Sequence, residues 1–427
     1  MTKVKQLFKN IGLEYRDILV LGVAGVVIGA AVGVLDAVFG RILNYCTEIR
    51  LEYFSWLIFF LPLAGAAIVG LYRKLGKSAA KGMNLVFQVG LGEAPGLPVR
   101  MVPLAMICTW ITHLFGGSAG REGVAIQIGA AVSSNVERFA GKWWNIRERK
   151  QIFLITGMAA GFSGLFQTPL AAIFFSLEVL IVGQLEYSAL FPASVAAFTA
   201  GAISGQLGIT KFHMEIAHGY GISLSFMLKL VVLGLIFGIV GTLFAEGIRQ
   251  VRSRLNAVFT GHPFRKVIIV GCILAVLILA LHQGRYSGTG ESLAELCFSG
   301  GEIYWYDWFL KGILTILTLS AGFVGGEVAP LFTIGACLGT VLAPLFGLPA
   351  PLVQALGYTA VFGSGTNTLI AAILVGSEVF GYGMLPYLAV TCITAYIFNL
   401  NKSIFSAQKK SMLQYLKERM KLEGEDE

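Results

Sequence analysis

The stretch GGSAGREGVAIQIGAAV, residues 116–132, places Arg121 and Glu122 side by side among glycines, between two apolar runs. The run MVPLAMICTWITHLF precedes it, and the chain after Glu122 is again mostly apolar. A lone carboxylate in such surroundings is costly, and it is by default a candidate functional residue. Adjacent residues on a helix point in different directions, so an ion pair between these two side chains is not the natural explanation.

The composition indicates a membrane protein. Of the 427 residues, 56% are hydrophobic and 13% are charged, whereas a soluble globular protein carries about 25% charged residues. Apolar runs recur along the chain, as in residues 18–39, 54–72, 226–244 and 266–281. Several approach or exceed the roughly 20 residues that cross about 30 Å of hydrocarbon. We therefore expect an all-α, polytopic membrane protein.

The charge distribution predicts the orientation. The net charge is +8, and basic residues gather outside the apolar runs, as in residues 72–81, 138–150 and 409–427. Lys and Arg accumulate on the cytoplasmic side of membrane proteins. Both termini are therefore expected in the cytoplasm, and nucleic acid is not an expected partner. The polar start MTKVKQLFKN argues against a cleavable signal peptide, and the scattered cysteines are expected to be buried free thiols.

The glycine-interrupted parts of the chain contain an internal repeat. AGFSGLFQTPLAAIFFSLEV (160–179) aligns with AVFGSGTNTLIAAILVGSEV (360–379) at a constant offset. GREGVAIQIGA (120–130) aligns in the same order with GEVAPLFTIGA (326–336), and both end in Ile-Gly-Ala. Paired, interrupted segments in two halves are the sequence sign of a transporter's binding site.

Interrupted helices of this kind predict an anion pathway. They survive in a bilayer only where protein or a water-filled cavity surrounds their ends. Half-helices whose N-termini meet there offer unpaired N–H groups and positive dipole ends, which favour an anion. We therefore expect an anion site where GREGV and GGEVAP converge, with inverted topology assumed from the transporter pattern.

The motifs resemble those of one family. GREGVAIQIGA resembles the signature of the CLC family of chloride channels and anion–proton exchangers, which reads GREGP, a small residue and QIGA. KGMNLVFQVGLGE (81–93) is similar to the family's GSGIP segment, GFVGGEVAPLFTIGACLG (322–339) to its GxFxP segment and QTPLAAIFFSLEV (167–179) to its NAPLAG segment. The resemblance implies the CLC fold, in which two inverted-topology helical repeats contain re-entrant, broken helices that meet at the midplane.

Departures from the family pattern point to one clade. Met83 stands where chloride-handling members have a serine, and Phe405 stands where they have a tyrosine. Val124 replaces the proline of GREGP, and Val179 stands where chloride–proton exchangers carry an internal proton-transfer glutamate. Glu327 replaces an apolar residue and is interpreted either as a helix cap or as a selectivity or cation-binding residue. Met83, GGEVAP and the missing glutamate together resemble the bacterial fluoride–proton antiporter clade, whereas Phe405 is a mismatch even there.

The resemblance also implies roles for individual residues. Glu122 becomes the gate and proton carrier, which occupies an anion site when ionised and swings away when protonated. Arg121 is expected to be structural, with a place on the pathway as the alternative. The implied anion-binding or pathway positions are Met83, Asn84, Gly123, Val124, Glu327, Val328, Ala329 and Phe405. Tyr396 is a further candidate to supply the missing tyrosine hydroxyl, and Glu178 and Glu378 are expected to pair structurally.

These inferences combine into one expectation. Residues 1–427 form a single transmembrane domain, with repeat one at about 1–200, repeat two at about 215–400, a short charged cytoplasmic tail at 403–427 and no cytoplasmic regulatory domain. The resemblance implies a homodimer in the plasma membrane that exchanges fluoride for protons across the lipid bilayer and so exports fluoride. No cofactor and no metal is implied, because the histidines share no spacing.

The sequence leaves alternative functions open. A chloride–proton antiporter or a passive chloride channel uses the same scaffold, although Met83 and Val179 argue against the former. An intramembrane enzyme would need a nucleophile–base pair or a ligand cluster such as HExxH, and the sequence displays neither. A non-transporting receptor would leave Glu122 unexplained.

Overall fold

The protein is a bundle of helices in the computed structural model, which describes residues 2–140, 149–216, 219–221 and 223–409, with side chains from Arg16 onward. The first half contains α1 (Thr2–Leu57), α2 (Leu61–Leu71), α3 (Met83–Gly90), α4 (Met101–Leu114), α5 (Glu122–Ala140), α6 (Arg149–Phe166), α7 (Pro169–Glu178) and α8 (Leu190–Gln206). The second half contains α9 (Leu224–Val258), α10 (Pro263–Ala280), α11 (Glu291–Phe298), α12 (Asp307–Ala321), α13 (Val328–Phe346), α14 (Ala350–Thr366), α15 (Ile370–Phe380) and α16 (Leu385–Ile397). Most of the expected tail lies outside the described residues.

Five helical segments of the described chain are long and apolar enough to cross a membrane. They are Arg16–Gly90, Tyr187–Gln206, Leu224–Val258, Pro263–Ala280 and Val328–Phe346. The helices α7 and α15 are apolar but too short to cross. They pack on each other and on α6 and α14, so protein surrounds their ends, as a bilayer requires. The expectation of a polytopic helical protein with broken helices is confirmed.

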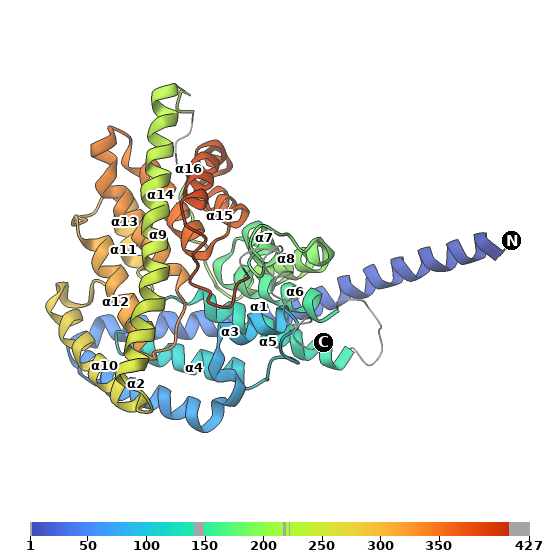
Figure 1. Cartoon of the computed structure of the whole chain (residues 1–427), viewed down its shortest axis with the longest axis horizontal. Helices are drawn as coiled ribbons and strands as arrows, with labels where there is room; N and C mark the ends of the chain where they lie inside the picture. The colour runs from blue at the N-terminus through green and yellow to red at the C-terminus, as the bar shows by residue number, and fades with distance from the viewer. Residues whose placement is uncertain (1, 141–148, 217–218, 222, 410–427) are drawn as a thin grey trace, which may run out of the picture.

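The two halves repeat one arrangement of helices. α1 packs on α6 and α8 as α9 packs on α14 and α16, and α5 packs on α6 as α13 packs on α14. The aligned sequence blocks fall on matching pieces, since α6–α7 and α14–α15 are each a helix, a bend and a short helix. In Figure 1, α6, α7 and α8 lie to the right, whereas α9, α11, α13 and α14 lie to the left.

Glu178 and Glu378 join the repeats by reciprocal capping. The Glu178 carboxylate accepts a hydrogen bond of 2.8 Å from the N–H of Ala371, in the first turn of α15. The Glu378 carboxylate accepts one of 2.8 Å from the N–H of Ala171, in the first turn of α7. Each carboxylate thus satisfies N–H groups that a helix start leaves free and meets the positive end of a helix dipole. The expected structural pairing of Glu178 and Glu378 is thus reciprocal, because each carboxylate caps a short helix of the other repeat. A two-fold axis between the repeats produces such a reciprocal arrangement.

Glycines set the closest helix contacts in both repeats. A Cβ on Gly129 of α5 would lie 2.0 Å from the carbonyl oxygen of Gly157 on α6. In repeat two, a Cβ on Gly335 of α13 would lie 2.0 Å from the carbonyl oxygen of Gly357 on α14. Small residues let membrane helices approach this closely. These contacts hold α5 on α6 and α13 on α14, and the site lies at the starts of α5 and α13.

Candidate functional site

The starts of α5 and α13 meet through their main chains. Gly120 and Gly326 exchange two main-chain hydrogen bonds, of 2.6 and 2.7 Å. A Cβ on Gly120 would lie 3.0 Å from the oxygen of Gly326 and 2.9 Å from Cδ of Pro330. Glycine at position 120 is therefore what allows the two segments to touch. The convergence of GREGV and GGEVAP that the repeat predicts is confirmed.

Glu122 lies between the two helix starts. It is the first residue of α5, and its side chain is 2% exposed. Its Oε2 accepts a hydrogen bond of 3.0 Å from the N–H of Ala329 in the first turn of α13, and one of 3.2 Å from the N–H of Arg121. The carboxylate thus occupies a position where two helix dipoles and free N–H groups favour negative charge.

The side chain of Arg121 is directed toward a different carboxylate. Its Nη2 lies 3.0 Å from Oε1 of Glu291, and its Nη1 donates to Oδ1 of Asn44 at 3.3 Å. Its Nε is 3.9 Å from Oε1 of Glu122 and forms no hydrogen bond with a described residue. Glu291 and Asn44 were not sequence candidates, because nothing in their local sequence connects them with Arg121.

The remaining candidates of the two motifs line the same junction. A Cβ on Gly123 would lie 3.6 Å from Oε2 of Glu327, so the Glu327 side chain lies beside the start of α5. Glu327 holds the N-cap position of α13, where the helix dipole favours a negative charge, and its side chain makes no capping hydrogen bond with a described residue. Val124 and Val328 are fully buried.

Met83, Asn84 and Phe405 come together at a second place. Met83 and Asn84 open α3, and Oδ1 of Asn84 accepts a hydrogen bond of 2.9 Å from the hydroxyl of Ser406. The neighbouring Phe405 ring is buried, with its centroid 5.2 Å from that of Phe87 on α3. Tyr396 is half-buried on α16, and its hydroxyl forms no hydrogen bond within the described part of the chain.

Aromatic rings connect these two places. A small cavity beside Glu122 is lined by Phe332, among other residues. The Phe332 ring lies 4.7 Å from that of Phe362, which lies 6.2 Å from that of Phe175. The Phe175 ring lies 6.2 Å from that of Phe405, edge to face. Phe166 and Tyr358 line the same cavity, and sequence reasoning missed both because only the fold brings α6 and α14 together there.

Two larger hollows flank this row of rings. The first, here called the Arg50 cavity, is lined among others by Arg50, Arg121, His282, Arg285, Ser287 and Glu291. The buried hydroxyl oxygen of Ser287 has no hydrogen-bond partner among the described residues. The second, here called the Phe405 hollow, is lined among others by Glu246, Arg249, Asn367, Lys402, Phe405 and Gln408. Basic side chains at both hollows suit an anion.

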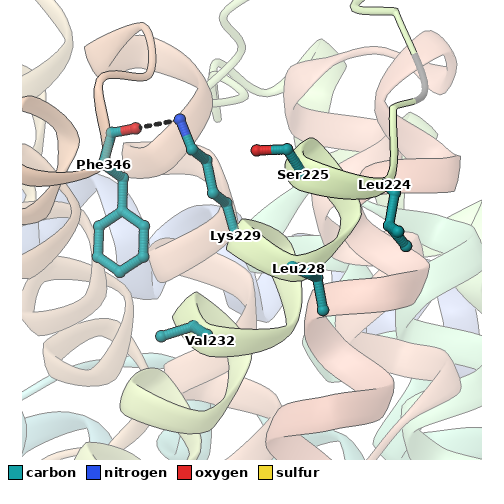
Figure 2. Close-up of a pocket in the computed structure, with 6 residues that line it drawn as sticks. All are labelled: Leu224, Ser225, Leu228, Lys229, Val232 and Phe346. Carbon is teal, nitrogen blue, oxygen red and sulfur yellow. Dashed lines mark hydrogen bonds between the residues drawn. The ribbon is translucent and has the colours of Figure 1, made fainter.

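A further hollow lies on the outside of the bundle and is separate from this row (Figure 2). Its lining is mostly apolar and comes from α9, with Phe346 at the end of α13. Lys229 donates a hydrogen bond of 2.6 Å to the carbonyl oxygen of Phe346. A cation there satisfies a carbonyl that the end of α13 leaves free and meets the negative end of its dipole. This lysine is therefore explained by the fold.

Comparison with known proteins decides the family. The sequence profile of the voltage gated chloride channel family matches residues 64–400. The chain belongs to this family. A solved structure of a CLC-type fluoride/proton antiporter is 46% identical, covers 92% of this chain and 99% of its own, and has a TM-score of 0.89. The CLC fold extends to a slow cyanobacterial Cl⁻/H⁺ antiporter at 20% identity, with coverage of 94% and 97% and a TM-score of 0.76.

Curated relatives in the voltage gated chloride channel family show the same ranking. A chloride/fluoride channel protein of Pseudomonas syringae pv. tomato is 36% identical over 395 residues, which are 91% of this chain and 86% of that protein. The H(+)/Cl(-) exchange transporter ClcA of Yersinia pestis bv. Antiqua is 26% identical over 424 residues, at 91% and 87% coverage. Among these family members, those named for fluoride are the more similar.

Proposed function

We propose that this protein exchanges fluoride for protons across the plasma membrane, so that protons entering the cell drive fluoride out. The observation that carries the proposal is the carboxylate of Glu122, which opens α5 and accepts a hydrogen bond from Ala329 at the start of α13. Relatives with fluoride in their names are 46% and 36% identical to this chain, which supports fluoride as the anion.

Glu122 is the gate and the proton carrier in this proposal. The ionised carboxylate fills the position between two helix starts that would otherwise attract a dissolved anion. A protonated carboxyl is a weaker acceptor, because hydrogen bonds to a charged oxygen are roughly twice as strong as neutral ones. Protonation therefore releases the N–H of Ala329 to a fluoride ion. Since the position holds either the carboxylate or the anion, fluoride and protons move in exchange.

The fluoride route connects the Arg50 cavity, the junction at Glu122 and the Phe405 hollow. The pathway positions are Met83, Asn84, Gly123, Val124, Glu327, Val328, Ala329 and Phe405. Fluoride must replace lost water with other hydrogen-bond donors, and main-chain N–H groups and the Asn84 amide supply them. Ring edges carry partial positive charge, so Phe405 and Phe175 can face an anion between these donors.

The placement in the membrane follows from the charges and from the family. The basic segment 409–427 directly follows the Phe405 segment in the sequence, and basic residues near the ends of membrane spans favour the cytoplasmic side. We therefore assign the Phe405 hollow and both termini to the cytoplasm, and the Arg50 cavity to the outside. The protein acts as a transporter and not as an enzyme, with repeats at about 1–200 and 215–400 in one domain, and it forms a homodimer as the resemblance implies.

Glu122→Gln tests this proposal, because the amide keeps the size and the acceptor but cannot carry a proton. In liposomes loaded with fluoride, the variant should release fluoride without proton uptake, whereas wild type couples the two. Asp17→Asn, an exposed carboxylate change on α1, is the matched control and should stay coupled. Coupling that survives in Glu122→Gln would show that another group carries the proton.

A further inference from the structure

Asp36 is a buried carboxyl within the membrane-spanning part of α1, and the roles assigned above do not include it. It is 0% exposed, and neither carboxylate oxygen has a hydrogen-bond partner among the described residues. It is the one carboxylate of the described chain whose buried oxygens both lack a partner. The other buried carboxylates differ, since Glu122, Glu178 and Glu378 each accept main-chain N–H groups.

Within the described part of the chain, no charged group pairs with Asp36 and holds it ionised. A Cβ on Gly164 of α6 would lie 2.4 Å from its Oδ2, so the carboxyl lies against bare main chain. α1 packs on α4, α5, α6 and α8. The titratable groups on these helices are Cys108, His113, Glu122, Glu137, Arg138, Arg149 and Lys150, with Arg41, Tyr45 and Cys46 nearest toward the C-terminal end of α1 itself. None forms a hydrogen bond or an ion pair with Asp36.

An isolated buried carboxylate without donors is strongly disfavoured, so the group holds a proton instead. An intramembrane ionisable residue is also by default a functional one, often part of a proton relay. We therefore expect Asp36 to rest protonated, at a position separate from Glu122.

The helix fold does not require a carboxyl at this point. Gly29 of α1 lies against Thr199 of α8, and Gly234 of α9 lies against Thr394 of α16 in the same way. These equivalent contacts align α1 of repeat one with α9 of repeat two. In this register Asp36 corresponds to Gly241. That glycine approaches Ser364 of α14, which corresponds to Gly164. At this contact repeat two has a glycine on α9 and a serine on α14, whereas repeat one has an aspartate on α1 and a glycine on α6. Packing alone therefore does not explain the aspartate in repeat one.

Asp36 lies on the N-terminal side of the Glu122 junction. It precedes Asn44, the partner of Arg121, along α1, and the eight intervening steps span about 12 Å at 1.5 Å per residue. Phe39, one turn from Asp36, packs in one cluster with Val124 and Ala125 of the first turn of α5. Under the proposed orientation, Asp36 is thus buried between Glu122 and the cytoplasm.

We propose that Asp36 is the second proton-carrying residue of the transporter and takes up the proton that Glu122 releases on its inward step. This inference rests on the proposed function. Asp36, which rests protonated, first gives its proton to water on the cytoplasmic side and becomes a carboxylate. The O–H bond of Glu122 then breaks and its proton passes to the Asp36 carboxylate, so that Asp36 is neutral again while Glu122 becomes anionic.

Asp36→Asn separates proton transfer from anion transport, because the amide has the same shape and cannot carry a proton. We expect fluoride-driven proton uptake in liposomes to fall about 100-fold or more, the lower range for removal of a positioned proton donor. Exchange of fluoride for fluoride at equal pH should continue, because it needs no net proton transfer. Asp17→Asn, an exposed carboxylate on the same helix, and Ser364→Ala, at the matched contact of repeat two, should retain coupling.

The outcomes are distinct. Unchanged proton uptake in Asp36→Asn, with coupling lost in Glu122→Gln, overturns the Asp36 inference and leaves the proposed function intact. An equal loss of both fluxes indicates a structural role and also overturns it. Wild type without proton coupling would instead contradict the proposed function. If Asp36→Asn does not assemble, infrared spectroscopy of wild type with isotope-labelled aspartate tests the inference instead. We expect the carbonyl band of a protonated aspartate at neutral pH. A spectrum in which all aspartates are ionised would contradict the inference.

Discussion

The N–H of Ala329 lies 3.0 Å from Oε2 of Glu122, across 207 residues of sequence. This hydrogen bond places the carboxyl group of one repeat at the helix start of the other. Because a helix start binds anions through free N–H groups, this is the position for which the carboxylate and fluoride compete in the proposed exchange. In that proposal, a movement of this one side chain exposes or covers the anion site.

Met83→Ser tests the source of anion selectivity. The substitution restores the hydroxyl that chloride-handling relatives carry at this position, beside Asn84 at the start of α3. A hydroxyl donates to chloride, whereas a thioether does not, so we expect the rate of chloride efflux relative to fluoride to rise. The ratio is measured with chloride and fluoride electrodes on the same liposomes. Met83→Leu is the control, and an unchanged ratio in Met83→Ser would exclude this position as a determinant.

Glu378→Ala should destabilise the protein without touching the anion site. It leaves the partly buried N–H group of Leu170 and the buried N–H group of Ala171 without acceptors, which costs about 1–3 kcal/mol. The expected result is a lower thermal unfolding midpoint in detergent. Glu178→Ala should behave alike because its contacts are reciprocal, and Glu378→Gln, which keeps an acceptor, should lose less. A Glu378→Ala protein as stable as wild type would contradict the capping role.

Gly129→Ala should disturb the packing of α5 on α6. The added methyl group would lie 2.0 Å from the carbonyl oxygen of Gly157, and overpacking typically costs about 1–3 kcal/mol, occasionally more. We expect a low yield of monodisperse protein, and the same for Gly335→Ala in repeat two. Gly221→Ala, where a Cβ meets open space, serves as the control. Normal yield and stability of Gly129→Ala would show that the helices can separate freely.

Sequence reasoning predicted the parts of the site that are marked by local pattern. The repeated Gly-rich motifs predicted the junction of Gly120 with Gly326, and the matched glutamates predicted a structural pairing. The partner of Arg121 could not be predicted, because Glu291 lies 170 residues away and only the fold joins them. Phe405 was predicted, but the rings that connect it with Phe332 could not be, because Phe175 and Phe362 lie on α7 and α14 and only the fold brings them together.

Asp36 shows a different limit of sequence reasoning. Its carboxyl group stands in an apolar run as Glu122 does, but no glycine cluster or recognisable motif marks it. Its carboxyl group has no hydrogen-bond donor among the described residues, and only the three-dimensional packing against Gly164 reveals this. Local sequence indicates that a group is ionisable, whereas its state depends on neighbours that the fold supplies.

The most direct test of the central claim uses purified wild-type protein in liposomes loaded with fluoride or with chloride, while the external pH is recorded. Fluoride should leave much faster than chloride, and its efflux should carry protons into the liposomes. Equal efflux of the two anions would contradict fluoride selectivity, and fluoride efflux without proton movement would make the protein a channel and contradict antiport.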